Sequence, residues 1–394
     1  MKSLINKKIL LGITGGIAAY KIPFLIRDII KKGGLVKCIL TEGSKEFVTP
    51  TTLKTLTKQK VYMDEFDIEE GVIPHTTLSK WPDVFVIAPA TANTISKLAG
   101  GIADNLLTLV GLDTRKPVLI VPSMHENMYN NEITQKNLEI LKRRGFNILE
   151  PEEGELAGGD RGKGRLPEIE RIVFEIEKIL EKKDFPNKKI VVTAGATREY
   201  IDPVRFISNP STGRMGFSLA REGVLRGGDV VLISGKTFLT PPYGVNFIEV
   251  DSAEDMKTEV FKHFDDLDYL IMAAAVSDFS PSSVVQEKIK KDSFNFTLSL
   301  SQTPDILKEA GERKKHQKLV GFALETENLL KNGYKKLKEK NLDMIVINEP
   351  TKNSGFEVET NKVTIILRSG DVYRFPLLSK EEVSKIIFDL LEGL

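Results

Sequence analysis

The sequence is poor in cysteine, in net charge and in long apolar runs, and each scarcity excludes a class of protein. Its one cysteine, Cys38, cannot form an intramolecular disulfide, and its position in the apolar run 35–40 predicts a buried strand residue. Lysine and arginine total 56 against 55 for aspartate and glutamate, so the net charge of +1 provides no field to gather nucleic acid or an anionic membrane. The apolar stretch before Gly12 has about five residues, too few for a signal-peptide core or a membrane span. We therefore expect a cytoplasmic protein that binds any anion at a local site.

Length and composition indicate two globular domains. The chain has 394 residues, of which 41% are hydrophobic and 28% charged. Short, β-branched apolar runs followed by glycine-bearing turns begin at Lys7 and Lys188, and each is typical of the first strand of a parallel sheet. The polar break at 184–187 contains proline and predicts the boundary, so that the expected domains span 1–186 and 187–394.

Strands and helices alternate along both halves, which predicts α/β domains with doubly wound sheets. In the first half the expected elements are a helix at 18–32, strands at 36–41, 84–88 and 118–121, and a last helix at 167–182. In the second half strands are expected at 190–193, 230–234, 269–274, 319–323, 344–347, 363–368 and 372–376. The last two strands form a hairpin, which predicts an antiparallel edge on a Rossmann-like sheet.

Two turns of small residues in the first half suit a phosphate-bearing cofactor. Gly15 and Gly16 follow the first strand, where backbone N–H groups can approach an anion. No G-x-G-x-x-G is present, and a tight turn requires glycine for steric reasons as well. The run Pro89-Ala90-Thr91-Ala92-Asn93-Thr94 follows a later strand, and His75 precedes Trp81. Both resemble the P-A-S-A-N-T signature and the active-site histidine region of the homo-oligomeric flavin-containing cysteine decarboxylases.

The resemblance implies a flavodoxin-like parallel sheet that binds FMN at the ends of its strands, with His75 acting beside the flavin. The implied FMN contacts are Gly15, Gly16, Ala18, Thr41, Pro89, Ala90, Thr91 and Asn93. In this family the flavin oxidises a cysteine thiol, carbon dioxide leaves, and the reduced flavin returns the electrons. Members assemble as trimers with FMN at the subunit contacts.

The chain departs from this family at two positions. A segment with Met124 and Met128 covers the substrate in relatives, and there His125 replaces an asparagine. Gly158 replaces the cysteine that donates a proton in the last reduction. Because glycine cannot donate a proton, either another acid such as His125 serves or the last step is impaired.

The second half contains a long glycine-bearing loop at 193–216, and loops of this length inside a compact domain more often bind a ligand. The segment closely resembles the T-A-G-p-T-R-E-x-i-D-p-V-R-x-i-s-N-x-S-s-G-x-M-G segment of phosphopantothenate-cysteine ligase. The resemblance implies that Asn209 acts at the acyl-nucleotide stage and that Arg205 shapes the phosphopantothenate site. Ligase domains of this family dimerise.

Further stretches follow in the order of the ligase family. The implied CTP contacts are Met272, Ala273, Ala274, Asp278, Lys288, Thr303, Pro304, Asp305, Ile306, Phe322, Lys336 and Lys340. Asp278 is also a candidate metal ligand, and Lys288, in the run 288–291, is the expected transition-state cation. Lys336 and Lys340 are four residues apart, so both fall on one helical face.

Together the two halves resemble the bifunctional enzymes of coenzyme A biosynthesis. The implied reactions are the CTP-dependent ligation of 4'-phosphopantothenate with L-cysteine through an acyl-cytidylate, with Mg2+ or Mn2+, and then FMN-dependent decarboxylation to 4'-phosphopantetheine. Two alternatives remain open. The flavodomain could have lost decarboxylation and serve as an oligomerising scaffold beside an active ligase, or it could bind and regulate another protein. The sequence leaves CTP against ATP preference undecided.

Overall fold

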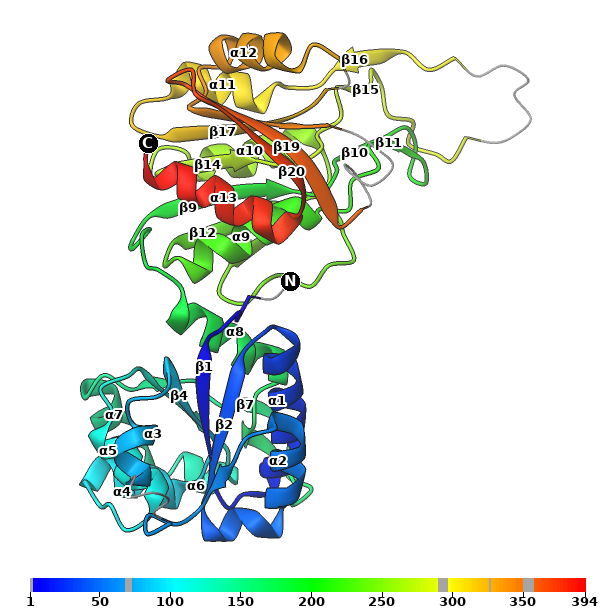
Figure 1. Cartoon of the computed structure of the whole chain (residues 1–394). Coiled ribbons are helices and arrows are strands. Elements are labelled where there is room, and N and C mark those ends of the chain that lie inside the picture. The colour runs from blue at the N-terminus through cyan, green and yellow to red at the C-terminus, as the bar shows by residue number, and fades with distance from the viewer. Residues whose placement is uncertain (1–2, 68–72, 290–296, 326, 350–357) are drawn as a thin grey trace. The chain divides into compact units, whose positions relative to one another are not determined.

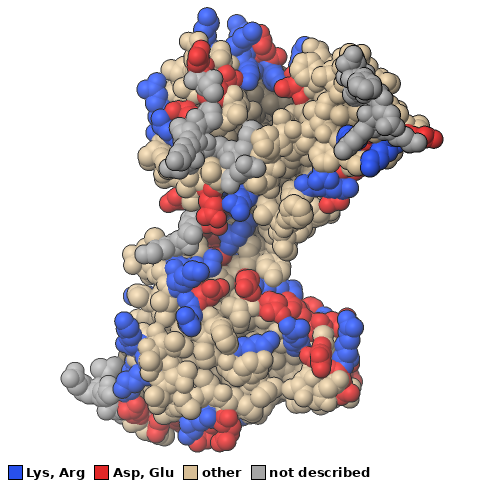
Figure 2. Space-filling view, turned by 90° about the vertical axis from the view of Figure 1, so that its right-hand side faces the viewer, with Lys and Arg blue, Asp and Glu red and all other residues tan. Residues whose placement is uncertain are grey.

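The computed structural model describes residues 3–67, 73–289, 297–325, 327–349 and 358–394. The chain divides into two compact units, Met1–Glu181 and Lys182–Leu394, which we call the N-terminal and C-terminal units (Figure 1). Within the described ranges, no helix has the length and apolar character needed to cross a membrane. On the face shown in Figure 2, basic and acidic side chains are interspersed, in keeping with the balanced composition.

The N-terminal unit is built on a six-stranded parallel sheet with the order β3-β2-β1-β4-β5-β6. Its strands are β1 (Lys8–Ile13), β2 (Leu35–Leu40), β3 (Val61–Tyr62), β4 (Val84–Ala90), β5 (Val118–Pro122) and β6 (Asn147–Ile148). Its helices are α1 (Ile22–Lys31), α2 (Pro50–Thr57), α3 (Pro74–Leu78), α4 (Ala92–Gly100), α5 (Leu106–Asp113), α6 (Glu126–Tyr129), α7 (Glu132–Arg143) and α8 (Ile169–Leu180). The order reverses between β1 and β4, which is where ligands bind in doubly wound sheets.

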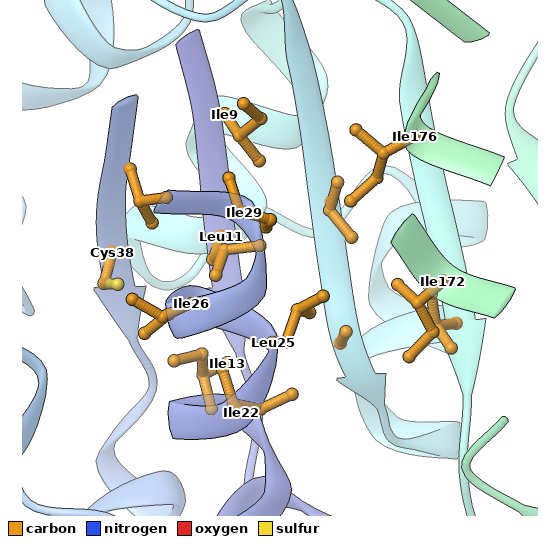
Figure 3. Packing of buried hydrophobic residues seen from close by; sticks show 14 of the residues in the cluster. Ile9, Leu11, Ile13, Ile22, Leu25, Ile26, Ile29, Cys38, Ile172 and Ile176 are labelled. Atoms are coloured by element: carbon orange, nitrogen blue, oxygen red, sulfur yellow. The ribbon is translucent and has the colours of Figure 1, made fainter. Parts of the chain in front are cut away.

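Helices cover both faces of this sheet. One face packs on α1, α2 and α8, and the other on α3, α4, α5 and α7. Figure 3 shows the first layer, in which Ile22, Leu25, Ile26 and Ile29 of α1 meet the apolar side chains of β1. Cys38 is buried in β2, as predicted, and its burial raises the pKa of the thiol to about 12.

The C-terminal unit has an eight-stranded sheet with the order β13-β12-β9-β14-β17-β18-β19-β20. Its strands are β9 (Lys189–Ala194), β12 (Asp229–Ser234), β13 (Asn246–Glu249), β14 (Tyr269–Met272), β17 (Lys318–Leu324), β18 (Met344–Asn348), β19 (Thr360–Leu367) and β20 (Val372–Ser379). The first six strands in this order are parallel, and β19 and β20 form the antiparallel edge. The predicted fold class is therefore confirmed for both halves. As in the N-terminal unit, the strand order reverses next to the strand that comes first in the sequence, here between β9 and β14.

The described residues of this unit form five helices that pack on the sheet. They are α9 (Arg214–Leu225), α10 (Ala253–His263), α11 (Ile306–Arg313), α12 (Leu329–Glu339) and α13 (Lys380–Glu392). The helices α10, α11 and α12 share one core with the sheet. The helix α9 packs closely against β9 on the other side. Gly216 allows this packing, since a Cβ at this position would stand 2.5 Å from the Cβ of Ala194.

The structure also contains elements that the sequence did not predict. Short antiparallel ribbons are formed by β7 (Glu152–Glu155) with β8 (Arg161–Arg165), β10 (Arg198–Tyr200) with β11 (Phe206–Ser208), and β15 (Phe279–Pro281) with β16 (Leu300–Gln302). The helix expected from 18 begins instead at Ile22 after a 3-10 turn, Ile17–Lys21, and Pro23 lies in its first turn, where its missing N–H costs no helical hydrogen bond. The strand expected at 269–274 ends at Met272.

Candidate active sites

In the N-terminal unit, Thr14 joins the two loops at the reversal of strand order. Its hydroxyl donates to the carbonyl of Pro89 at 2.7 Å and accepts from the backbone N–H of Thr91 at 3.1 Å. The Thr91 hydroxyl also caps α4, accepting from the N–H of Thr94. The loop after β1 and the signature segment 89–94 therefore lie side by side.

The loop after β2 closes against the same place. A Cβ at Gly15 would lie 2.9 Å from the backbone of Gly43, so Gly15 allows the two loops to meet. The Thr41 hydroxyl donates to the carbonyl of Ile13 at 3.3 Å. Among the expected FMN contacts, Ala18, Pro89 and Ala90 are buried and Asn93 is exposed in the first turn of α4. Small residues and a helix N-terminus at a reversal of strand order are suited to a phosphate-bearing group.

His75 is the second residue of the short helix α3. Its Nδ1 atom is buried and has no hydrogen-bond partner among the described residues. A buried ring nitrogen without a partner is costly in a folded protein and suggests that a ligand supplies the partner. This observation fits a histidine that faces a bound group.

His125 is the N-cap residue of α6, and the ribbon β7–β8 lies beside this helix. Its Nδ1 accepts from the N–H of Asn127 at 3.3 Å, which leaves the ring hydrogen on Nε2, 3.2 Å from Asp160 Oδ2. Asp160 follows Gly158 in the loop that joins β7 to β8, so the two positions that depart from the decarboxylase family lie close together. Met128 is half exposed on α6.

Two glycines in β8 allow this strand to pack closely against the segment 124–126. They were not predicted from the sequence as site residues. A Cβ at Gly164 would stand 2.0 Å from the carbonyl oxygen of Met124, and a Cβ at Gly162 would overlap the Glu126 carboxylate. The Met124 N–H donates to the Gly164 carbonyl at 3.0 Å. The alternation of glycine with charged residues in Arg-Gly-Lys-Gly-Arg at 161–165 was the sequence pattern that could have indicated this close packing.

In the C-terminal unit, a cavity of about 610 Å³ opens at the carboxyl ends of β14, β17 and β18. Of the residues expected to contact CTP, those lining it are Met272, Ala273, Ala274, Asp278, Thr303, Pro304, Asp305, Ile306, Phe322, Lys336 and Lys340. Asn209 lines it as well. Segments that are far apart in the sequence therefore meet at one place.

Asn209 is held against the end of β14. Its side-chain amide donates to the carbonyls of Ala275 and Val276 at 3.3 and 3.1 Å. The N–H of Ala275 also donates to the carbonyl of Gly195 at 2.8 Å, so the loops that follow β9 and β14 run together. This contact fixes Asn209 at the reversal of strand order.

Lys336 of α12 and Lys340, the C-cap residue of the same helix, are both paired with carboxylates. Lys336 Nζ lies 2.7 Å from Glu325 Oε1, and Lys340 Nζ lies 2.8 Å from Asp305 Oδ1. Burial raises the pKa of Glu325, but the hydrogen bonds from Lys336 and Asn332 and the charge of Lys336 together outweigh it and lower the pKa. Both lysines, four residues apart, line the cavity as expected, and their charges are compensated there by these carboxylates.

Arg205 and Lys288 lie outside the set of residues that line the cavity. The Arg205 guanidinium is 2.6 Å from the buried carboxylate of Asp202 and donates to the carbonyl of Ile289 at 3.1 Å. Burial raises the pKa of Asp202, but the backbone N–H groups of Val204, Arg205 and Ile289 outweigh it and lower the pKa to about 2. The ionised Asp202 therefore anchors the exposed Lys288 segment, while residues 290 and 291 of the lysine run lie outside the described residues.

Several residues that line the cavity were not predicted. They are Ser211, Thr212, Gly213 and Arg214 at the start of α9, Asn348 at the end of β18, Asn361 in β19 and Lys380 at the start of α13. A polar residue at the end of the apolar strand 344–348 was a signal for Asn348. In the described part of the chain, no group of three or more His, Cys, Asp or Glu residues could hold a metal ion.

Comparison with known proteins places each unit in a family. Residues 2–181 match the family described as Flavoprotein, and residues 185–394 match the DNA/pantothenate metabolism flavoprotein C-terminal domain. The chain therefore has the class of architecture in which a flavoprotein domain precedes a pantothenate-metabolism domain.

Curated relatives match most of the chain. The chain is 45% identical over 393 residues to the Coenzyme A biosynthesis bifunctional protein CoaBC of Bacillus subtilis (strain 168), covering 98% of this chain and 96% of that protein. It is 46% identical over 346 residues to a Cysteine/Cysteine sulfinic acid decarboxylase from an unknown prokaryotic organism, covering 86% of this chain and 96% of that protein. A solved C-terminal domain of a CoaBC protein is 40% identical with a TM-score of 0.47, covering 54% of this chain and 97% of that one. The chain belongs to the family of bifunctional coenzyme A biosynthesis proteins.

Proposed function

We propose that the C-terminal unit joins 4'-phosphopantothenate to L-cysteine with CTP, and that the N-terminal unit decarboxylates the product with FMN. The ligase and decarboxylase steps of coenzyme A biosynthesis follow from membership of the family across 98% of the chain. The choice of CTP, the divalent ion and the residue roles rest on the resemblance of the site segments to the ligase family. The observation that carries them is the one cavity lined by Asn209 together with the segments 272–278 and 303–306.

The ligase reaction has two balanced steps. First a carboxylate oxygen of phosphopantothenate attacks the α-phosphorus of CTP, the bond to the β-phosphate breaks, and pyrophosphate leaves. Then the cysteine amine attacks the acyl carbon, CMP leaves with the bridging oxygen, and the amine proton passes to solvent. Asn209 holds the acyl-nucleotide. Asp278 would hold Mg2+ or Mn2+, which would offset phosphate charge when bound.

Lys288 is proposed to approach the α-phosphate from its anchored segment and to stabilise the charge that develops there. Replacing it by glutamine (Lys288→Gln) should slow pyrophosphate release from CTP on the order of a hundredfold, as expected for loss of one electrostatic stabiliser. Lys338→Gln, on an exposed position of α12 that does not line the cavity, is the matched control. A pyrophosphate release rate equal to that of the parent would remove Lys288 from the mechanism.

The N-terminal unit is proposed to hold FMN at the loops joined by Thr14. The unpartnered Nδ1 of His75 and the small residues of those loops fit such a group. When bound, FMN supplies two-electron oxidation and reduction. His75 Nδ1 takes the proton released by the substrate, and the segment with Met124 and Met128 covers the substrate and excludes water.

A single substitution tests the role of His75. His75→Asn should leave the purified protein yellow with bound FMN but abolish carbon dioxide release from phosphopantothenoylcysteine, because an amide cannot accept a proton as an imidazole nitrogen can. Carbon dioxide release at the parent rate would refute the role. If the parent protein releases carbon dioxide from free cysteine and not from phosphopantothenoylcysteine, the same site has a different substrate.

We also propose a cytoplasmic homo-oligomer, with trimeric contacts between N-terminal units and dimeric contacts between C-terminal units. In support, Ile17, Tyr20 and Phe24 are exposed apolar residues that follow the loop at 14–16 directly. A neighbouring subunit that covered them would also enclose the FMN site. Native mass spectrometry of the intact protein measures the assembly.

A further inference from the structure

The ribbon β10–β11 of the C-terminal unit connects two candidate site residues that lie far apart in the sequence. Asn209 follows β11 directly, and its amide is bonded to the end of β14. At the other end of the ribbon, the turn 201–205 contacts the segment that carries Lys288. The Ser208 hydroxyl donates to the carbonyl of Thr197 at 2.8 Å, and β10 lies beside β15. One element therefore reaches from Asn209 to the Lys288 segment.

Asp202, in the turn of this ribbon, accepts four hydrogen bonds. Its Oδ1 accepts from the backbone N–H groups of Val204 and Arg205, each at 2.8 Å. Its Oδ2 accepts from the Arg205 guanidinium at 2.6 Å and from the backbone N–H of Ile289 at 3.2 Å. The side chain is 0% exposed. Each carboxylate oxygen therefore has two donors and is satisfied by the protein itself.

The Lys288 segment is attached to this turn through its backbone. Ile289 donates its N–H to Asp202, and its carbonyl accepts from Arg205 at 3.1 Å. The N–H of Val285 donates to the carbonyl at the start of the same turn at 3.0 Å. The side chains between Val285 and Ile289 are exposed, so these backbone hydrogen bonds, rather than packing, set the position of Lys288. We call Asp202, Arg205 and Ile289 the Asp202 clasp.

A carboxylate suits the clasp better than an amide of the same size. All four partners of Asp202 are donors, and an ionised carboxylate accepts on both oxygens. An asparagine would direct its NH2 group at two of these donors, whichever way the amide is turned. Asp202→Asn therefore keeps the volume of the side chain but weakens the clasp.

We propose that Asp202 is a positioning residue of the ligase, which holds Lys288 in register with Asn209 through the clasp. Asp202 is not among the described residues that line the cavity, and it acts through the backbone of Ile289. The assignment rests on the proposed role of Lys288 at the α-phosphate and adds the residue that places it. Since Lys288 acts when the acyl-cytidylate forms, a weakened clasp slows that step and leaves the later attack by cysteine unchanged.

The test measures pyrophosphate release from CTP by the full-length protein with 4'-phosphopantothenate and Mg2+ present. Asp202→Asn should slow this step about ten- to hundredfold, as expected when a charged group is misplaced by a lost hydrogen bond. The double variant with Lys288→Gln should be within about twofold of Lys288→Gln alone, because Asp202 acts through the same charge. Cysteine added to preformed acyl-cytidylate should be consumed by Asp202→Asn at the parent rate.

Asp343→Asn is the matched control for a buried carboxylate. Asp343 is 4% exposed, and its Oδ2 accepts from the backbone N–H of Leu319 at 2.8 Å and from Lys314 Nζ at 2.6 Å. It precedes β18, and the opposite end of this strand lines the cavity. Asp343→Asn should therefore lower the melting temperature, as Asp202→Asn does, but release pyrophosphate at the parent rate.

The outcomes separate this inference from the proposed function. A folded Asp202→Asn protein that releases pyrophosphate at the parent rate overturns the inference, and so do effects that multiply in the double variant, because Asp202 then acts independently of Lys288. If Asp202→Asn does not fold, Ile289→Pro, which removes the N–H that Asp202 accepts, must show the same slowing without additivity, and its failure to do so also overturns the inference. A parent protein that releases no pyrophosphate refutes the ligase itself, and the inference with it.

Discussion

His125 and Gly158 are the residues at which the chain differs most from the flavin-containing decarboxylases that it resembles. The structure brings their segments together through the contact between His125 Nε2 and Asp160. In this arrangement both ring nitrogens are engaged, so proton donation by His125 requires its Nε2–H to leave Asp160. Asp160 would then orient the ring between turnovers, and we propose that His125 supplies the proton that Gly158 cannot.

Substitution at these two positions tests that proposal. His125→Asn should still release carbon dioxide but accumulate the oxidised ene-thiol product, because only the final protonation is affected. Adding Gly158→Cys should restore 4'-phosphopantetheine, measured by mass spectrometry. A Cβ at Gly158 would have only Asp160 Oδ2 within 4 Å, at 3.9 Å, so a cysteine fits without displacing the backbone.

Gly158→Ser in the same His125→Asn background is the matched control. Serine adds a side chain of similar size without a thiol, and it should leave the ene-thiol product in place. If His125→Asn alone forms 4'-phosphopantetheine at the parent rate, His125 is not the donor.

At the scale of elements, the short segment before β9 belongs to the C-terminal unit. Phe185 is 1% exposed and packs edge-on against Tyr269 and Phe388, at ring-centroid distances of 5.4 and 5.2 Å. Asp184 lies 3.0 Å from the buried guanidinium of Arg226. A fragment that begins at 187 therefore loses both contacts.

This placement predicts different stabilities for two fragments. Residues 182–394 and 187–394 should both show ligase activity without flavin, because the ligase cavity lies wholly within them. The shorter fragment should be less stable by about 3–5 kcal/mol, the usual cost of losing a buried phenylalanine. Urea unfolding followed by circular dichroism measures the difference, and Phe185→Ala in the longer fragment should reproduce most of it. Coincident unfolding curves would show that Phe185 contributes nothing.

Sequence patterns predicted the long parallel strands because their apolar, β-branched runs are continuous and buried. They missed the ribbons β7–β8, β10–β11 and β15–β16, whose three to five residues carry no apolar periodicity and depend on tertiary contacts. The cavity residues that follow strands were predicted through family resemblance. Lys380 and Asn361 were not, because only the folding of β19, β20 and α13 onto the sheet brings them to the cavity.

At the scale of the whole molecule, the two units repeat one design for different chemistry. In each unit the strand order of the sheet reverses beside the strand that comes first in the sequence, between β1 and β4 and between β9 and β14. The candidate site of each unit lies at this reversal. In the N-terminal unit small residues and Thr14 shape the loops, whereas in the C-terminal unit lysines and amides line a polar cavity. The product of the second unit is the proposed substrate of the first, so both reactions can be followed in one protein.

One anaerobic incubation tests this account most directly. The intact protein is mixed with 4'-phosphopantothenate, L-cysteine, CTP and Mg2+, and all products are identified by mass spectrometry. We predict CMP, pyrophosphate, carbon dioxide and 4'-phosphopantetheine, with CMP and 4'-phosphopantetheine in equal amounts. Accumulation of 4'-phosphopantothenoylcysteine without carbon dioxide would contradict the decarboxylase half of the account, and absence of CMP would contradict the ligase half.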